Sequence, residues 1–181
     1  MNKMPNSETQ SGDDPILRVQ AQNYALMEMV SEQITLDTFD ANDHQLLKRL
    51  VVDGLGDSRG LVRLRFAETL GEIGEPATPF LLEALQYHPN VTIRRAAAKT
   101  LTIIADRAAV PVLLQAFLND EDTVVHGSAA GALARTGEEA VPALLEILAS
   151  PEHPENTKGH AAWALAFIGS EASEHLYSIR P

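Results

Sequence analysis

The sequence contains no cysteine among its 181 residues. This absence excludes disulfide bonds, a thiol nucleophile, and thiolate ligation of zinc or of an iron–sulfur cluster by this chain alone. No apolar run approaches the roughly 18 residues that a membrane-spanning helix needs. The N-terminal segment MNKMPNSETQ also lacks the apolar centre of a secretory signal. These absences together predict a cytoplasmic protein.

Basic residues are scarce as well. The chain has 14 Lys and Arg against 25 Asp and Glu, which gives a formal net charge of −11. This charge disfavours nucleic acid and an anionic membrane surface as partners, because both repel a strongly acidic protein. The positions of the few Lys and Arg residues are therefore informative about what the protein binds.

A helix-pair pattern recurs along the chain with a period of about 31–32 residues. Its clearest copy is VTIRRAAAKTLTIIADRAAVPVLLQAFL, residues 91–118. Apolar residues at spacings of three and four predict two amphipathic helices, with Asp106 as an N-cap and Pro111 in the first turn of the second helix. Four sets of small or apolar residues recur in register: Ala67, Ala98, Ala130 and Ala162; Leu70, Leu101, Leu133 and Leu165; Gly74, Ala105, Gly137 and Gly169; Pro79, Pro111 and Pro142.

These repeats predict an all-α fold, an α-solenoid in which each helix pair buries its apolar face against its neighbours. The expected pairs span residues 43–74, 75–105, 107–137 and 139–169, and a terminal half repeat begins near Glu171. Residues 1–14 are polar and are expected to form a disordered tail, residues 15–42 a capping segment, and residues 43–181 the solenoid. The half repeat would leave an unfinished apolar edge, which either continues in a longer protein or meets a partner.

One basic residue occupies the same position in the second helix of each pair: Arg63, Arg94, His126 and Lys158. Neighbouring helices lie ~8–10 Å apart, so this basic column would extend ~30 Å along the inner surface of the solenoid. Arg95 and Arg135 belong to the same helices. The pattern predicts a groove that binds something anionic.

A structural alternative exists for the basic column. In stacked helix pairs a recurrent Arg often bonds an Asp in the loop of its own or the next repeat, and Asp57 and Asp122 are placed for that role. A His or Lys cannot replace the bidentate fork of Arg. We therefore expect His126 and Lys158 to face solvent or a ligand.

His160 and Trp163 lie one helical turn apart in the last full pair, and Trp163 is the only tryptophan. They form either a stacking surface beside a titratable group or a core Trp next to a surface His. His160 is a weak candidate for proton transfer. Glu-His pairs occur at residues 152–153 and 174–175, but in a loop and a first helix, so the sequence predicts no metal site.

The repeat VRxxAAxxLxxIG followed by xAVPxLLxxL resembles the phycobilisome-lyase HEAT-like repeat family, over about residues 43–179. The same repeat occurs in bilin lyase subunits, in phycobilisome degradation factors and in scaffolds. The resemblance implies attachment, removal or transfer of an open-chain tetrapyrrole such as phycocyanobilin on a phycobiliprotein cysteine, with a second HEAT-repeat subunit as partner. It leaves open whether this chain is itself an enzyme, and it implies no cofactor of its own.

Two functions follow as hypotheses. In the first, the basic column binds the bilin propionates, Trp163 covers a pyrrole ring and His160 moves a proton. In the second, the chain is a non-catalytic scaffold for protein–protein interaction, which grips an acidic partner during cofactor or iron–sulfur assembly.

Overall fold

The computed structural model describes residues 14–178, and the side chains of residues 14–173. The chain divides into two compact units at Phe39 and Asp40. The predicted disordered tail lies almost entirely outside the described residues. Only Asp14 of that segment is described, as the N-cap of the first helix, where its carboxylate accepts a hydrogen bond from the Ile16 backbone N–H at 2.9 Å.

The first unit is built around α1 (Pro15–Thr35). Pro15 occupies the first turn, where its missing N–H has no helical partner to lose. Leu26, Met27 and Val30 are buried at spacings of one, three and four, so they share one face of the helix. After α1 the chain turns at Asp37, whose φ is 55°. The capping role expected for residues 15–42 stays a prediction.

The second unit contains the repeats. Its helices are α2 (His44–Arg49), α3 (Gly60–Ile73), α4 (Thr78–Tyr87), α5 (Val91–Ile104), α6 (Val110–Asn119), α7 (Thr123–Thr136), α8 (Val141–Ala149) and α9 (Glu155–Ser178). The π-helical turn η1 (Leu50–Gly54) extends α2. Short 3₁₀ turns η2 (Glu75–Ala77), η3 (Arg107–Ala109) and η4 (Gly137–Ala140) precede α4, α6 and α8.

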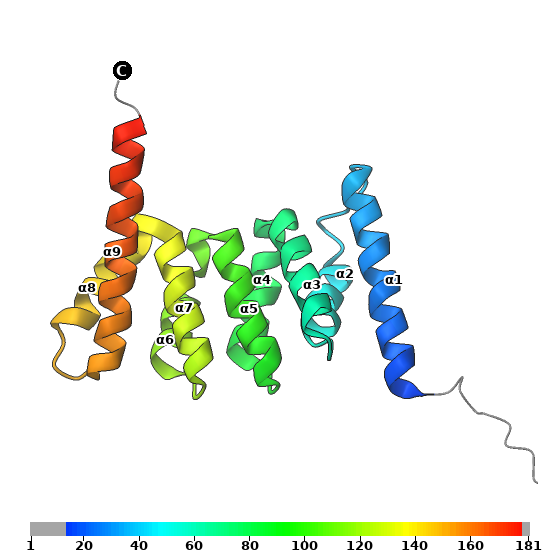
Figure 1. Ribbon diagram of the computed structural model, residues 1–181, viewed down its shortest axis with the longest axis horizontal. Helices are drawn as coiled ribbons and strands as arrows, with labels where there is room; N and C mark the ends of the chain where they lie inside the picture. The colour runs from blue at the N-terminus through cyan, green and yellow to red at the C-terminus, as the bar shows by residue number, and fades with distance from the viewer. Residues whose placement is uncertain (1–13, 179–181) are drawn as a thin grey trace, which may run out of the picture. The chain divides into compact units, whose positions relative to one another are not determined.

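These helices form two layers (Figure 1). The inner layer consists of α3, α5, α7 and α9, each packed against the next. Behind it lie the outer helices α4, α6 and α8, which pack against the inner helices that follow them, and η1, the continuation of α2, packs against α3. No strand occurs between residues 14 and 178. The predicted all-α solenoid of helix pairs is therefore confirmed.

Recurrent residues explain why each pair turns where it does. The inner helices end at Gly74 (φ 76°), Ala105 (φ 56°) and Gly137 (φ 73°), a conformation that stops an α-helix. A proline then opens the next outer helix, where its fixed φ suits the first turn. The recurrent leucines fill the space between the layers and are fully buried: Leu70, Leu81, Leu101, Leu113, Leu133 and Leu144.

The end of the repeat region differs from the prediction. We expected a turn at Gly169 and a new helix from Glu171, but α9 continues without a break from Glu155 to Ser178. The signal that ends the other inner helices is incomplete here. Pro142 follows Gly137 by five residues, whereas Glu174 stands five residues after Gly169. Glutamate favours helix and does not interrupt it, so the terminal half repeat is an extension of α9.

Candidate functional site

The predicted basic column bonds the loops that precede its own helices. The Arg63 guanidinium donates from Nη1 to the Asp57 carbonyl at 2.6 Å, and His126 bonds the Asp120 carbonyl through Nε2. Because a carbonyl only accepts, the His126 Nε2 carries the proton. Arg94 donates to the His88 carbonyl at 3.2 Å. In all three cases the acceptor lies six residues before the donor, so this position fixes the loop at the start of α3, α5 and α7.

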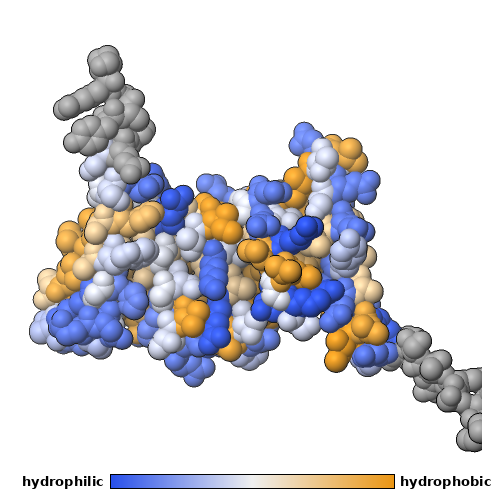
Figure 2. Space-filling view, in the orientation of Figure 1, coloured by the Kyte–Doolittle hydropathy of each residue, from blue (hydrophilic) through white to orange (hydrophobic). Residues whose placement is uncertain are grey.

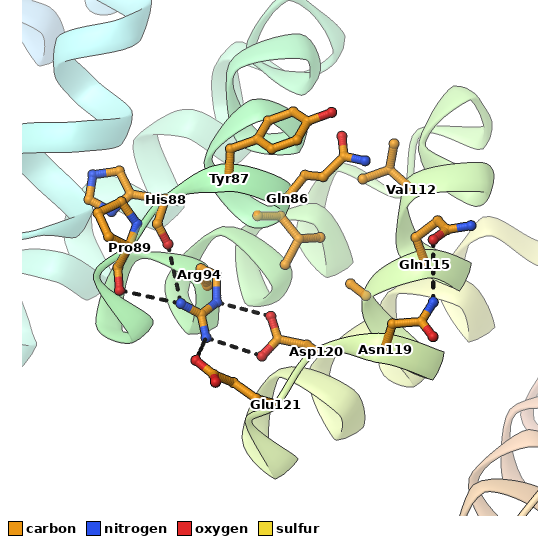
Figure 3. A pocket seen from close by; sticks show the side chains of 12 residues that line it. Gln86, Tyr87, His88, Pro89, Arg94, Val112, Gln115, Asn119, Asp120 and Glu121 are labelled. Carbon is orange, nitrogen blue, oxygen red and sulfur yellow. Dashed lines mark hydrogen bonds and ion pairs between the residues drawn. The ribbon is translucent and has the colours of Figure 1, made fainter.

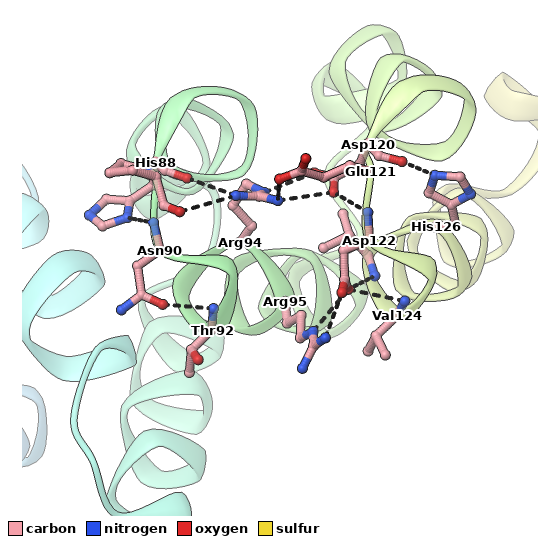
Figure 4. A network of polar contacts seen from close by, with 12 residues as sticks. His88, Asn90, Thr92, Arg94, Arg95, Asp120, Glu121, Asp122, Val124 and His126 are labelled. Carbon is pink, nitrogen blue, oxygen red and sulfur yellow. Dashed lines mark hydrogen bonds and ion pairs between the residues drawn. The ribbon is translucent and has the colours of Figure 1, made fainter.

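Arg94 is the most strongly held member of the column (Figure 4). Its Nε and Nη2 donate to the two carboxylate oxygens of Asp120 at 2.9 and 3.2 Å, and Nη2 also reaches Glu121 at 3.3 Å. The hydrogen bonds that Arg94 donates to Asp120 raise the pKa of Arg94 above its ordinary value. Only 10% of the Arg94 side chain is exposed. The structural alternative therefore describes Arg94, which joins its repeat to the loop of the next one. Its carboxylate is Asp120 and not the expected Asp122, which bonds Arg95.

The fourth member departs from this pattern. Lys158 lies 3.7 Å from the exposed carboxylate of Glu155, within its own helix. Among the described residues, no loop carbonyl accepts a hydrogen bond from the Lys158 ammonium group. The expectation that His126 turns toward solvent is wrong, because its ring replaces the Arg hydrogen bond to the loop. Arg63, Arg94, His126 and Lys158 do not form one open row of cations.

A hollow of about 490 Å³ lies between the C-terminal ends of α4 and α6 (Figure 3). Gln86, Tyr87 and Gln115 stand around it, and Arg94 lies at its base. The Arg94 donors already bond Asp120, Glu121 and two loop carbonyls. This hollow therefore offers a ligand no available positive charge from Arg94.

Arg95 lies next to the column and holds the start of α7. Its Nε and Nη2 donate to the two oxygens of Asp122 at 2.8 and 2.5 Å. Asp122 also accepts from the backbone N–H groups of Val124 and Val125 at 3.1 Å, as the N-cap of α7. The hydrogen bonds from Arg95, followed by those from the backbone, hold the pKa of Asp122 far below its ordinary value of 3.8.

This lowered pKa predicts an acid-dependent loss of stability. Folding favours the ionised form of Asp122, so its contribution is present above about pH 4 and is lost as the pH falls through the lower folded pKa. We expect Asp122→Asn to be less stable than the native chain at neutral pH. The difference should shrink steadily below about pH 4 in urea unfolding followed by circular dichroism. A difference that stays constant over this range would contradict the assignment.

The open surface of the inner layer is formed by other positions. On α3, α5 and α7 the side chains of Leu64, Ile103 and Val124 are about half exposed. With Arg63, Arg95 and Lys99 they line a groove of about 400 Å³. Lys99 is exposed and forms no ion pair with any residue whose side chain is described. We call this surface the basic–apolar groove, and Figure 2 shows polar and apolar patches side by side on this face.

A second feature of the same layer is an aromatic cluster on α7 and α9. The rings of Trp163 and Phe167 lie 5.9 Å apart, and the Arg135 guanidinium stands 5.9 Å above the Phe167 ring. Arg135 also lies 3.6 Å from Glu171. Trp163 is 52% exposed, so it is not the core residue that the alternative interpretation predicted. We call Arg135, Trp163 and Phe167 the aromatic shelf.

His160 lies one turn before Trp163 and is exposed. Its Nδ1 is 3.0 Å from the Asn156 carbonyl, and its ring meets the buried Phe117 edge-on at 6.3 Å. Nδ1 therefore carries the proton and, in the neutral ring, Nε2 is a free acceptor. This tautomer suits proton acceptance from a bound group.

The sequence prediction missed Leu64, Ile103 and Phe167. Lys99 and Ile103 follow Arg95 by four and eight residues, so they share its face of α5. Leu64 and Ile103 are apolar residues that fall outside the buried face defined by Leu70 and Leu101. Apolar residues that lie outside the buried face of a helix indicate an exposed apolar surface. The pattern of charged residues does not reveal such a surface.

No group of three or more His, Asp or Glu side chains that could hold a metal ion occurs among the described residues. Within the same part of the chain, none of the helices is long and apolar enough to cross a membrane.

Comparison with known families adds the last observation. Residues 48–134 and 110–179 match the HEAT repeats. The chain belongs to the HEAT-repeat family. The two matched segments overlap and together cover the repeats from α2 to α9, which agrees with the helix pairs described above.

One curated protein is similar to part of this chain. The bilin biosynthesis protein MpeU of Synechococcus sp. (strain WH8020) is 59% identical to this chain over 59 residues. The matched stretch is 33% of this chain and 20% of that protein. The likeness to phycobilisome-lyase HEAT-like repeats is thereby confirmed.

Proposed function

We propose that this HEAT-repeat chain acts on phycobiliproteins by binding an open-chain tetrapyrrole, with phycocyanobilin as the candidate, while it is attached, removed or transferred. The observation that carries the proposal is the 59% identity to a bilin biosynthesis protein. The chain has no cysteine, so a thioether to the bilin would form on a cysteine of the other protein.

The basic–apolar groove has the chemistry that such a ligand needs. A bilin combines apolar pyrrole rings with two negatively charged propionates. Leu64, Ile103 and Val124 offer exposed apolar surface. Beside them stands the positive charge of Lys99, which forms no ion pair with the side chains of residues 14–173. Arg95 shares its charge with Asp122 through Nε and Nη2, so its Nη1 is the donor that remains for a propionate. In this proposal the propionates bind Lys99 and Arg95, and the rings cover the apolar side chains.

His160 is the candidate for proton transfer. When a thiol adds across a carbon–carbon double bond, the S–C bond forms and the thiol proton ends on the neighbouring carbon. A base that takes the proton from sulfur and returns it to carbon assists both directions of this reaction. The free Nε2 of His160 has the required lone pair. This proposed proton transfer does not depend on the assignment of the basic–apolar groove, because His160 does not line that groove.

The groove is tested by Lys99→Glu. Charge reversal places a carboxylate beside the propionates, so we expect the affinity for free phycocyanobilin to fall at least tenfold, or by about 1.4 kcal/mol. Bilin absorbance and induced circular dichroism measure the binding. Lys48→Glu is the matched control, because Lys48 is an exposed lysine of α2 whose ion pair with Glu83 contributes little. A native chain that leaves the bilin spectrum unchanged would rule out the proposal.

The scaffold hypothesis has one observation in its favour, the exposed aromatic shelf, which resembles a protein-binding surface more than a pigment site. Purification from cells discriminates between the two functions. A coloured complex supports bilin binding, whereas a colourless complex with one acidic protein supports the scaffold.

A further inference from the structure

The aromatic shelf presents an unusual amount of aromatic surface to solvent. Trp163 is 52% exposed. Its ring contacts the Phe167 ring, which in turn contacts the Arg135 guanidinium. Trp and Arg are the side chains most enriched at the energetic centres of protein interfaces. Covering the exposed part of a Trp side chain removes a large apolar area from water, which favours binding of a partner.

The surface beside the shelf has room for a helix. α7 lies between α5 and α9, and its outward positions carry little or no side chain at Gly127, Ser128 and Gly131. A Cβ placed on Gly131 would meet nothing within 4 Å. The axes of α5 and α9 are two helix spacings apart, ~16–20 Å. A helix with its side chains is ~10–12 Å wide and fits above α7 within this width.

We call the surface over these small residues of α7 the trough, and basic side chains border it. Lys99 stands on the α5 side and Arg135 on α7, and the titratable His160 stands on the α9 side. The facing acid is Glu171, which lies 3.6 Å from Arg135. Basic side chains are scarce in this chain of net charge −11. The presence of Lys99 and Arg135 beside the trough therefore favours an occupant that carries carboxylates.

We propose that the trough along α7 receives an acidic amphipathic helix of a protein partner, with Trp163 as its anchor. The apolar face of that helix covers Trp163 and Phe167, and its carboxylates meet Lys99 and Arg135. The choice of a phycobiliprotein as this partner rests on the proposed function. The location does not, because its residues Trp163, Phe167 and Arg135 lie outside the lining of the basic–apolar groove, although Lys99 borders both surfaces.

Two substitutions test the trough. Trp163→Ala removes the anchor, and Gly131→Leu fills the space above α7 while improving the helix propensity, so that variant folds at least as well as the native chain. We expect each to weaken binding to an immobilised, purified phycobiliprotein at least tenfold. Lys48→Glu on the other layer should leave it unchanged. Circular dichroism confirms that each variant is folded.

Free phycocyanobilin supplies the second arm of this experiment. Trp163→Ala and Gly131→Leu should retain bilin binding within twofold, because neither residue lines the basic–apolar groove. If the native chain does not bind the phycobiliprotein, or if both variants bind it normally, the trough is not a docking site. If the two variants lose the bilin instead of the protein, the trough holds pigment and the inference is overturned. If the native chain binds no bilin but loses the phycobiliprotein on either substitution, the trough stands and the proposed function fails.

Discussion

Arg94→Ala is expected to lower the free energy of unfolding by about 3–5 kcal/mol. The substitution leaves the Asp120 carboxylate, only 9% exposed, without its bidentate partner. It also removes the donors to the His88 and Pro89 carbonyls. A buried charge without a partner costs far more than an exposed pair contributes. Urea unfolding followed by circular dichroism measures the loss.

Two further variants sharpen this test. Arg94→Lys should lose most of the same stability, because one ammonium group cannot meet both Asp120 oxygens and two loop carbonyls. Arg65→Ala is the control, since Arg65 is an exposed base of α3 whose removal should change stability by less than about 0.5 kcal/mol. A cost below about 1 kcal/mol for Arg94→Ala would show that Asp120 stays solvated.

Gly54→Ala is expected to destabilise the fold by about 1–3 kcal/mol. Gly54 ends the π-helical turn η1 and is buried against the Phe66 ring. A Cβ at this position would stand 2.9 Å from Cδ2 of Phe66 and closer still to Cγ and Cδ1. Phe66 is fully buried, so its ring has no space into which it can move. Thermal and urea unfolding should both report the loss.

Gly131→Ala provides the matched comparison. Gly131 lies in the middle of α7, and an added Cβ there meets open space. Alanine is the better helix former by ~1 kcal/mol, so this variant should be as stable as the native chain or slightly more so. Equal effects of the two substitutions would contradict the packing described around Gly54.

The fold was predictable because its determinants repeat. Leu70, Leu101 and Leu133 occupy one buried position in successive copies, and Pro79, Pro111 and Pro142 mark the start of each outer helix. Agreement among several copies outweighs the weak signal of any one helix. The continuous α9 was harder to predict, because Gly169 occupies the position at which the other inner helices end, although no proline follows it five residues later.

The candidate site was harder to predict, because a difference of one residue turns a side chain by about 100° around the helix axis. Arg94 and Arg95 are neighbours, yet Arg94 is buried against Asp120 and Arg95 reaches the open groove. Charge pattern alone could not separate them. What separates them is the position of the loop carbonyls and of Asp120 and Asp122, which belong to the next repeat.

The bonds from Arg94 and Arg95 to that loop also bear on how the array comes apart. They join α5 to the start of α7 through two carboxylates, whereas the inter-repeat ion pairs Lys48–Glu83 and Arg135–Glu171 have both partners largely exposed. In a linear array each boundary contributes its own coupling free energy. The central boundary should therefore open last, and amide protons of α5 and α7 should exchange with solvent more slowly than those of α3 and α9.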